Sequence, residues 1–200
     1  MDQTAFTDSR VTKTINRIHD GMVNLLKTKA YNDITVKDIC EKGQISRTTF
    51  YTHYKTKDDF IYSYLNTLLK EAKKKFLKSE TLTQAIFLKK MIYFWLSEGQ
   101  LILMLLGDES AYKLHQVIKK SLQQRIEINV VPVLNTKMLT TKEKYFLLIF
   151  MSNAIIGVLQ DWVKRGYKES PKEVAEIMNK IFENSKKILF SSCIFKINTT

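Results

Sequence analysis

Ten residues, ISRTTFYTHY at positions 45–54, combine hydrogen-bonding side chains with aromatic rings and contain no acidic residue. An arginine can make two hydrogen bonds to a guanine edge, and threonine hydroxyls and methyls contact neighbouring bases. Tyrosine, histidine and lysine side chains bind phosphate oxygens, which fixes the position of a protein on the duplex without reading sequence. This chemistry predicts a DNA-contacting surface made of Arg47, Thr48, Tyr51, Thr52, His53 and the nearby Lys57.

Two short helices would position these side chains. Thr35, with Asp38 in the first turn, predicts the start of a helix that ends near Lys42. The residues GQI form a turn, and Ser46 predicts the cap of a second helix that ends near Tyr54. This arrangement matches a helix-turn-helix. Apolar residues at helical spacing face the core, which leaves the DNA-contacting residues on the outer side of the second helix.

The remaining sequence predicts further helices and no strands. Six glycines and two prolines in 200 residues leave few helix breaks, so the expected fold class is all-α with about nine helices. A first helix is expected from about 8 to 29 and a fourth from about 56, and Ser170, Pro171 and Glu173 mark the start of the last. The other helices are expected at about 81–97, 99–106, 109–130, 141–165 and 171–190. We expect a DNA-binding domain over residues 1–55 and a helical regulatory and dimerisation domain over residues 56–200.

The net charge and the residue composition indicate which classes of partner and cofactor to expect. Thirty-two Lys and Arg against twenty Asp and Glu give a net charge of +12, which favours a polyanion such as nucleic acid. His19, His115 and the two cysteines, Cys40 and Cys193, form no metal-ligand spacing, so no metal or other cofactor is expected. The sequence contains no nucleophile–base pairing and no glycine-rich phosphate loop, which argues against an enzyme.

The sequence indicates a cytoplasmic protein with no membrane partner. Charged residues occupy the first twenty positions, where a signal peptide would need an apolar stretch. The longest apolar run, YFLLIFM at 145–151, is too short to span a bilayer.

The helix-turn-helix segment ITVKDICEKGQISRTTFYTHYKTKDDFI resembles the DNA-binding domain of TetR-family transcriptional regulators over about residues 10–62. The resemblance implies base contacts from Lys37, Arg47 and Thr48. It also implies contacts to the DNA backbone from Thr49, Tyr51, His53 and Lys57, with Ser46 at the helix start. The family usually has alanine-glycine in the turn, where this chain has Gly43-Gln44. We therefore expect Gln44 to adopt a conformation that glycine would favour.

The C-terminal segment NAIIGVLQDWVKRGYKESPKEVAEIM, residues 153–178, is similar to the last two helices of a Firmicutes-type branch of this family. The helix over 141–165 is apolar almost all round, and one subunit cannot cover all of it. Pairing the last two helices with their copies would give a four-helix bundle across a two-fold axis. The expected dimer interface is Ile155, Leu159, Trp162, Val174, Ile177 and Ile181.

The middle helices are rich in methionine and aromatic residues, as in MIYFWL and LILMLL. These side chains form either plain core or a pocket for a small, apolar effector, as in many family members. The pocket candidates are Met91, Tyr93, Trp95, Gln100, Met104 and Met151. We expect a homodimeric repressor that binds a palindromic operator and is released by such an effector. The alternative is an effector-free activator or co-regulator that a partner protein controls.

Overall fold

The computed structural model describes residues 3–76, 84–129 and 139–190. These residues form nine α-helices and two short 3-10 turns, with no strand among them, which confirms the all-α fold class. The helices are α1 (Gln3–Leu26), α2 (Val36–Lys42), α3 (Arg47–His53), α4 (Lys57–Phe76), α5 (Gln84–Ser97), α6 (Gln100–Gly107), α7 (Tyr112–Asn129), α8 (Thr141–Lys164) and α9 (Pro171–Phe190). The 3-10 turns are η1 (Tyr31–Asp33) and η2 (Glu109–Ala111).

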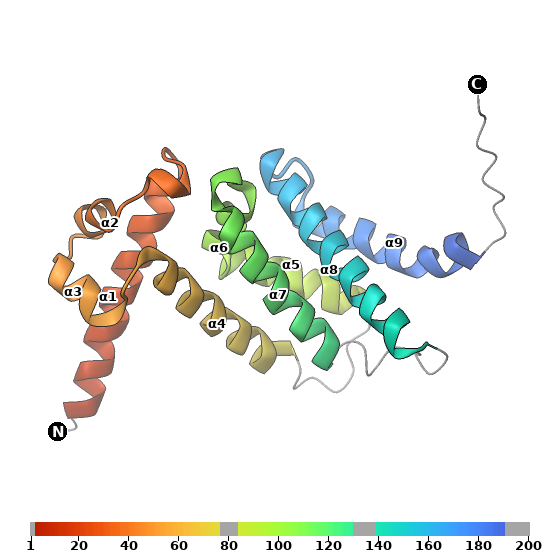
Figure 1. Cartoon of the computed structure of the whole chain (residues 1–200), viewed down its shortest axis with the longest axis horizontal. Helices are drawn as coiled ribbons and strands as arrows, with labels where there is room; N and C mark the ends of the chain where they lie inside the picture. Colours follow the sequence, from red (N-terminus) through yellow and green to blue (C-terminus); the bar gives the residue numbers. More distant parts are fainter. Residues whose placement is uncertain (1–2, 77–83, 130–138, 191–200) are drawn as a thin grey trace.

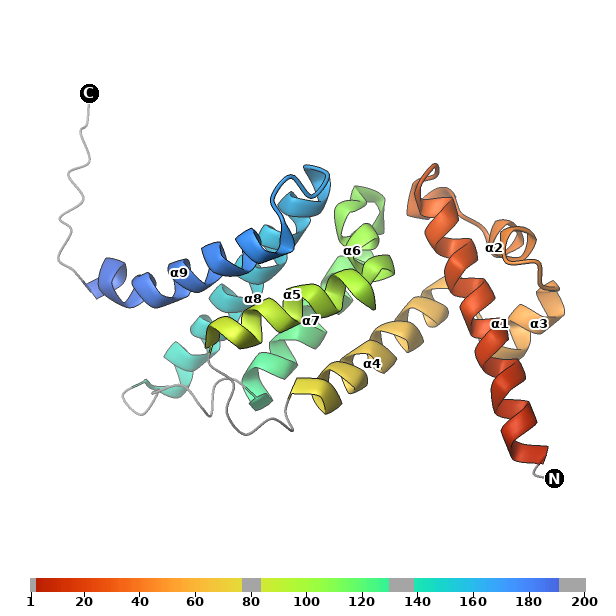
Figure 2. The ribbon, with the colours of Figure 1, turned by 180° about the vertical axis from the view of Figure 1, so that it is seen from behind.

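The molecule is elongated, with α1–α3 at one end and α5–α9 at the other (Figures 1 and 2). Helix α4 runs from the first group toward the second. Helix α1 begins at Gln3, earlier than expected from the sequence. The sequence pattern depends on side chains that pack, and the first α1 residue with a fully buried side chain is Ile18.

Local capping explains where α2 and α3 begin. The Thr35 hydroxyl accepts from the Asp38 N–H at 3.2 Å, and the Asp38 carboxylate accepts from the Thr35 N–H at 2.8 Å. The hydrogen bonds that the Asp38 carboxylate accepts from the Thr35 N–H and the Thr35 hydroxyl, and a lesser one from Lys29, lower the pKa of Asp38 to about 2. The Ser46 hydroxyl accepts from the Thr49 N–H at 2.9 Å and so caps α3. Both helix starts are therefore as the sequence predicts.

Two glycines allow α1 to cross close to the turn between α2 and α3. A Cβ on Gly43 would lie 2.6 Å from the Arg17 carbonyl oxygen, and one on Gly21 would lie 3.1 Å from the Gly43 nitrogen. Gln44, the next residue of the turn, has φ 53°, which confirms the expected left-handed conformation. The helix-turn-helix is thus held against α1 by close backbone contact at Gly43.

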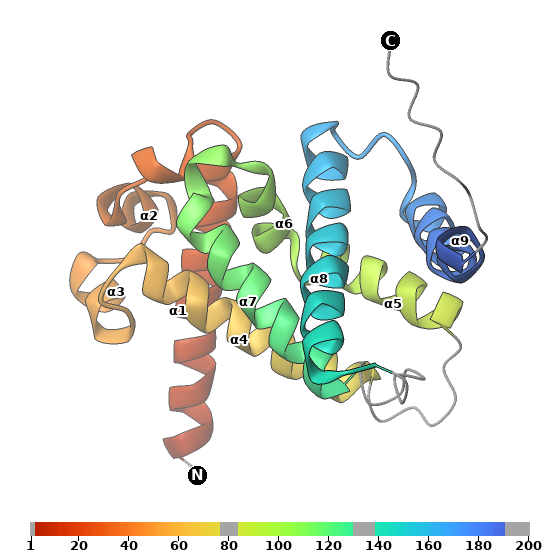
Figure 3. The ribbon, with the colours of Figure 1, turned by 45° about the vertical axis from the view of Figure 1, so that its right-hand side comes forward.

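The C-terminal body is built around α6, whose leucine and isoleucine side chains are almost entirely buried. Helix α6 packs against α1, α5 and α8, and α9 packs along α5. Figure 3 shows α8 between α7 and the α5–α9 pair. The start of α9 is as predicted, because Ser170 and Glu173 exchange hydrogen bonds at the N-terminus of the helix. The short turn from Asp108 delays the start of α7 to Tyr112, because the Asp108 carboxylate accepts from the Ser110 N–H at 2.9 Å.

Candidate nucleic-acid interface

Helix α3 is fixed by an aromatic cluster on its inner side. Phe50 is fully buried, and its ring lies 5.9 Å from the ring of Tyr54. Tyr54 in turn makes an edge-to-face contact with Phe60 of α4 at 5.3 Å between centroids. Edge-to-face pairs of this kind add stability beyond area burial. The cluster therefore sets the direction in which the opposite side of α3 points.

The opposite side of α3 is open to solvent. Arg47, Thr48 and Thr52 are exposed, and Tyr51 is 55% exposed. Among the described residues, no hydrogen bond or ion pair engages the Arg47 guanidinium, so its donors are available to an external acceptor. Helix α3 contains no acidic residue, so nothing on the helix repels a phosphate. This face can donate hydrogen bonds to base edges in a major groove.

Other predicted contact residues already have local hydrogen bonds. The Ser46 and Thr49 hydroxyl oxygens lie 2.8 Å apart, and the Thr52 hydroxyl donates to the Thr48 carbonyl at 2.9 Å. In the free subunit the Ser46 hydroxyl therefore serves as the N-cap of α3. The Thr52 oxygen keeps its acceptor lone pairs, because its proton is the group that is used. His53 is half-buried, and its ring packs beside Tyr54.

Lys37 lies on the outer surface of α2. Its side chain is 61% exposed and lies 3.7 Å from the Glu41 carboxylate, one helical turn away. An exposed pair of this length is weak, so the lysine can turn to a phosphate or base at little cost.

Lys57 makes its hydrogen bonds within the subunit. Its ammonium donates to the carbonyl oxygens of Tyr31 at 2.6 Å, Ile34 at 2.7 Å and Asn32 at 3.3 Å. It also lies over the Tyr31 ring at 4.3 Å from the centroid. An ammonium has three protons, and all three have acceptors here. In the free subunit Lys57 therefore holds η1 in place, and its expected phosphate contact stays a prediction. Desolvation of the ammonium lowers its pKa.

The same turn is held from its other side by the start of η2. The Tyr31 N–H donates to the Asp108 carboxylate at 2.6 Å, and the Asn32 N–H donates to the Ser110 hydroxyl at 3.1 Å. The Tyr31 hydroxyl donates to the Asp58 carboxylate. We call Tyr31, Lys57, Asp58, Asp108 and Ser110 the domain junction. No local sequence pattern reveals this junction, because its hydrogen-bond partners lie 26 to 78 positions apart.

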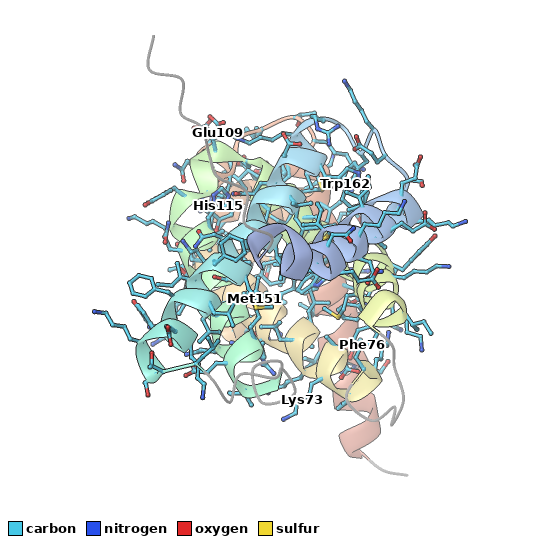
Figure 4. All side chains as sticks on the ribbon, turned by 90° about the vertical axis from the view of Figure 1, so that its right-hand side faces the viewer. Lys73, Phe76, Glu109, His115, Met151 and Trp162 are labelled. Atoms are coloured by element: carbon cyan, nitrogen blue, oxygen red, sulfur yellow. The ribbon has the colours of Figure 1, made fainter. Side chains whose placement is uncertain are left out.

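The six predicted effector-pocket residues do not share one environment. Tyr93 is 45% exposed and Gln100 is exposed, so the two expected polar anchors lie at the surface. Met91, Trp95, Met104 and Met151 are half-buried at the edge of the core. Figure 4 shows Met151 near the middle of the C-terminal body, with His115 and Trp162 toward one end.

Polar side chains in this body are paired with each other. His115 Nε2 lies 2.7 Å from the Leu105 carbonyl oxygen, and Gln160 Nε2 lies 3.4 Å from His115 Nδ1. Gln160 also donates to the Leu106 carbonyl at 3.3 Å. Together these side chains cover the C-terminal carbonyls of α6, which have no partners within the helix. Among the described residues, no fully buried side-chain nitrogen or oxygen lacks a hydrogen bond.

Three of the six residues of the predicted dimer interface are buried within the single subunit. Trp162 is 2% exposed, Val174 5% and Leu159 8%, so these side chains pack inside their own subunit. Trp162 donates its indole N–H to the Glu169 carbonyl at 2.9 Å. Ile155 is half-buried, whereas Ile177 is 49% and Ile181 56% exposed.

A different set of α8 side chains is exposed to solvent. Phe146, Phe150 and Val158 are 58%, 61% and 38% exposed, and Ala154 and Gly157 lie between them on the same side of the helix. We call Phe146, Phe150, Ala154, Gly157 and Val158 the open face of α8. The i, i+4 spacing of the two phenylalanines was visible in the sequence. However, α8 is apolar on all sides, so the sequence pattern does not show which side is left exposed by the neighbouring helices.

Within the described residues, α8 is the one helix long and apolar enough to cross a membrane. Only 22% of its most apolar stretch is buried in the subunit. The helix nevertheless packs against α6 and α7, and it buries Ser152 with a hydrogen bond from Gln123 at 3.1 Å. Those contacts place α8 within the helical body, and its open face remains exposed to solvent in the single subunit.

A helix-turn-helix with an outward basic reading face, followed by a helical body, defines a class of DNA-binding transcriptional regulators. Comparison with known proteins is consistent with that class. Residues 81–184 match a TetR family model described as "Transcriptional regulator C-terminal region", and this match covers more than half of the chain. The chain therefore belongs to the TetR family, which is a family of DNA-binding transcriptional regulators and not of enzymes.

Two solved structures share the fold. A TetR transcriptional regulator from Streptococcus agalactiae 2603V superposes with a TM-score of 0.61 at 21% identity, over 90% of this chain and 98% of that one. A dihydroxyacetone kinase operon activator, DhaS, superposes with a TM-score of 0.58 at 16% identity, over 88% of this chain and 97% of that one. No curated protein sequence matches the chain.

Proposed function

We propose that the protein is a cytoplasmic homodimer that binds a palindromic operator and represses transcription until a small apolar effector releases it. The observation that carries the DNA-binding part is the outer face of α3, where Arg47 is exposed and has no partner among the described residues. A charged guanidinium at such a position gains most from a bidentate contact with guanine.

The residues of this end of the molecule divide into readers and anchors. Arg47 and Thr48 lie at the start of α3 and act as base readers, together with Lys37 of α2 and with Thr52 one turn further along α3. Phosphate contacts are assigned to Tyr51, Thr49 and His53, because hydroxyl and ring N–H groups donate to phosphate oxygens. Lys57 is left out of this set, because its protons are used in the domain junction.

Dimerisation is supported by the open face of α8. Large aromatic side chains that are more than half exposed on an apolar helix mark a surface that another molecule covers. Ile177 and Ile181 of α9 offer a second exposed apolar strip. In a two-fold arrangement each patch meets its own copy, so one surface on each subunit suffices. Two reading helices related by such an axis require a palindromic site.

Selection of DNA from a random duplex pool tests this proposal. The purified protein is mixed with duplexes that contain about 30 randomised base pairs, and the retained fragments are sequenced. We expect an enriched inverted repeat whose half-sites lie about one helical turn apart or a multiple of it. Enrichment of a single unrepeated motif would contradict the dimer, and the absence of any enriched motif would contradict sequence reading by α3.

Effector binding is supported by the half-buried Met91, Trp95, Met104 and Met151, which leave apolar surface partly uncovered in the body. The chain has two tryptophans, so a Trp162→Phe variant retains Trp95 as its only indole. We expect an apolar ligand that releases DNA to shift the Trp95 emission to shorter wavelength, because the indole loses contact with water. A releasing compound that leaves this emission unchanged would place the effector elsewhere.

A second candidate function is activation without an effector, under the control of a partner protein. Two observations favour it: the fold is shared with an operon activator, and the buried polar side chains of the described body already have partners. A promoter reporter decides between the two functions. Loss of the protein raises expression from the selected operator if it is a repressor and lowers expression if it is an activator.

A further inference from the structure

Three cations line one side of α1 near its N-terminus. Arg10, Lys13 and Arg17 occupy positions i, i+3 and i+7, which lie above one another on a helix. All three are exposed, and among the described residues no hydrogen bond or ion pair engages their charged groups. Residues 3–17 contain these three cations and a single acid, Asp8. We call Arg10, Lys13 and Arg17 the α1 stripe.

Arg10 and Lys13 precede the point where α1 crosses the helix-turn-helix, on the part of α1 that extends past the rest of the subunit, and Arg17 lies at the crossing. The crossing with the helix-turn-helix is at the Arg17 backbone, opposite Gly43, and full burial of side chains begins at Ile18. Figures 1 and 2 show the N-terminal end of α1 at the same end of the molecule as α3, and Figure 3 shows it projecting beyond the other helices. A duplex that lies against α3 therefore passes on the same side of the molecule.

A projecting helix of this kind has little to stabilise it in the free protein. Isolated helices of about 15 residues are marginal in water, and like charges at i, i+3 and i+4 spacing repel each other. Over residues 9–17 the apolar Val11 and Ile15 are only half-buried, so packing contributes little along this stretch. A polyanion along the stripe would remove the repulsion and release the counterions that the phosphates had condensed.

We propose that the α1 stripe is a second DNA contact, which binds backbone phosphates that flank the half-site read by α3. This inference rests on the proposed DNA-binding function. The stripe adds sequence-independent binding energy outside the base pairs that Arg47 and Thr48 contact. The stripe offers no planar array of donors and acceptors matched to a base pair, so its contribution is the same for every flanking sequence.

The test uses the double variant R10A/K13A in the full-length dimer. Alanine has the highest helix propensity, so the α1 helix is retained while the two charges are removed. The matched control K168A/K180A removes two exposed lysines from the opposite end of the molecule, one before α9 and one in the middle of α9. Equal unfolding midpoints for the three proteins establish that any loss of binding is not a loss of fold.

Binding is measured against the selected operator duplex and against a random duplex of the same length, from about 50 to 200 mM salt. Loss of two contacts per subunit should flatten the slope of log K against log salt by about 3–4 for the dimer. The affinity lost over this salt range should then be about 100-fold smaller for R10A/K13A than for the parent protein. The ratio of operator to random affinity should stay unchanged, and the control should behave as the parent.

Duplex length supplies an independent readout. The parent protein should bind an operator with about ten flanking base pairs on each side more tightly than a trimmed one, and R10A/K13A should bind both equally. An unchanged salt slope, or an unchanged preference for flanks, would overturn the proposal. Failure of the proposed function would look different, because the parent protein itself would then show no preference for operator over random DNA.

Discussion

The backbone N–H of Tyr31 donates a 2.6 Å hydrogen bond to the carboxylate of Asp108, a residue 77 positions further along the chain. Asp108 also caps η2 through the Ser110 N–H, and Lys57 holds the carbonyls of the same η1 turn. The turn that follows α1 is therefore fixed to the helical body by both its donors and its acceptors. Small changes at this junction would alter the placement of the reading helix.

Asp108→Ala should lower the free energy of unfolding by about 1–3 kcal/mol, because a part-buried N–H loses its acceptor and η2 loses its cap. Asp108→Asn keeps an acceptor oxygen and should cost less. Urea denaturation measures both variants. Asp161→Ala, which removes an exposed partner of Arg165, is the control and should change stability by less than about 0.5 kcal/mol. If Asp108→Ala and Asp161→Ala lowered the free energy of unfolding equally, the hydrogen bonds of the junction would stabilise the fold no more than an exposed ion pair does.

Lys57→Met should destabilise the protein by about 1–3 kcal/mol, because three backbone carbonyls lose a charged donor while the apolar part of the side chain is retained. The neighbouring Lys55→Met, at an exposed position, is the matched control and should leave stability unchanged. Urea midpoints and the salt slope of DNA binding are measured together. Normal stability with a flatter slope would restore the phosphate contact that the sequence suggested for Lys57.

Substitutions at two adjacent residues of the helix-turn-helix turn should change the free energy of unfolding in opposite directions. Gly43→Ala would place a Cβ against the Arg17 carbonyl oxygen and should cost about 1–3 kcal/mol through overpacking. Gln44→Gly relieves a left-handed φ of 53° and should add about 0.5–1 kcal/mol. Thermal unfolding of the two variants gives the signs. A neutral Gly43→Ala would mean that α1 can move away from the turn at little cost.

The dimer surface is tested on the open face of α8 and on α9. Phe150→Glu and Ile181→Glu each place an unpaired carboxylate in the proposed interface, and each should raise the dimer dissociation constant by about 100-fold or more. Ile128→Glu is the control, because Ile128 is 66% exposed on α7 and lies outside the proposed surface. Analytical ultracentrifugation reports the three dissociation constants. A Phe150→Glu protein that remains dimeric at low micromolar concentration would remove α8 from the interface.

Much of this architecture was predictable because its signals are local. The Thr35 and Ser170 caps, the Ser46 cap and the left-handed Gln44 each depend on residues a few positions apart, so the sequence displays them directly. The reading face of α3 follows in the same way from the buried Phe50. The hydrogen bonds of Lys57 could not be predicted, because an exposed and a part-buried lysine look alike in sequence and only the distant η1 carbonyls distinguish them. The burial of Trp162 and Leu159 within the subunit could not be predicted, because periodicity shows that a helix is apolar but does not show which neighbour covers each side.

The central claim is that Arg47 reads bases, and its most direct test compares Arg47→Ala with the parent protein on operator variants. Each position of the selected half-site is replaced in turn, and binding is measured at one fixed salt concentration. If Arg47 contacts a guanine, the variant should lose about 1–3 kcal/mol of discrimination at one base pair per half-site and keep it at the others. A variant that weakens operator and random DNA by one common factor, with discrimination intact at every position, would contradict base reading by Arg47.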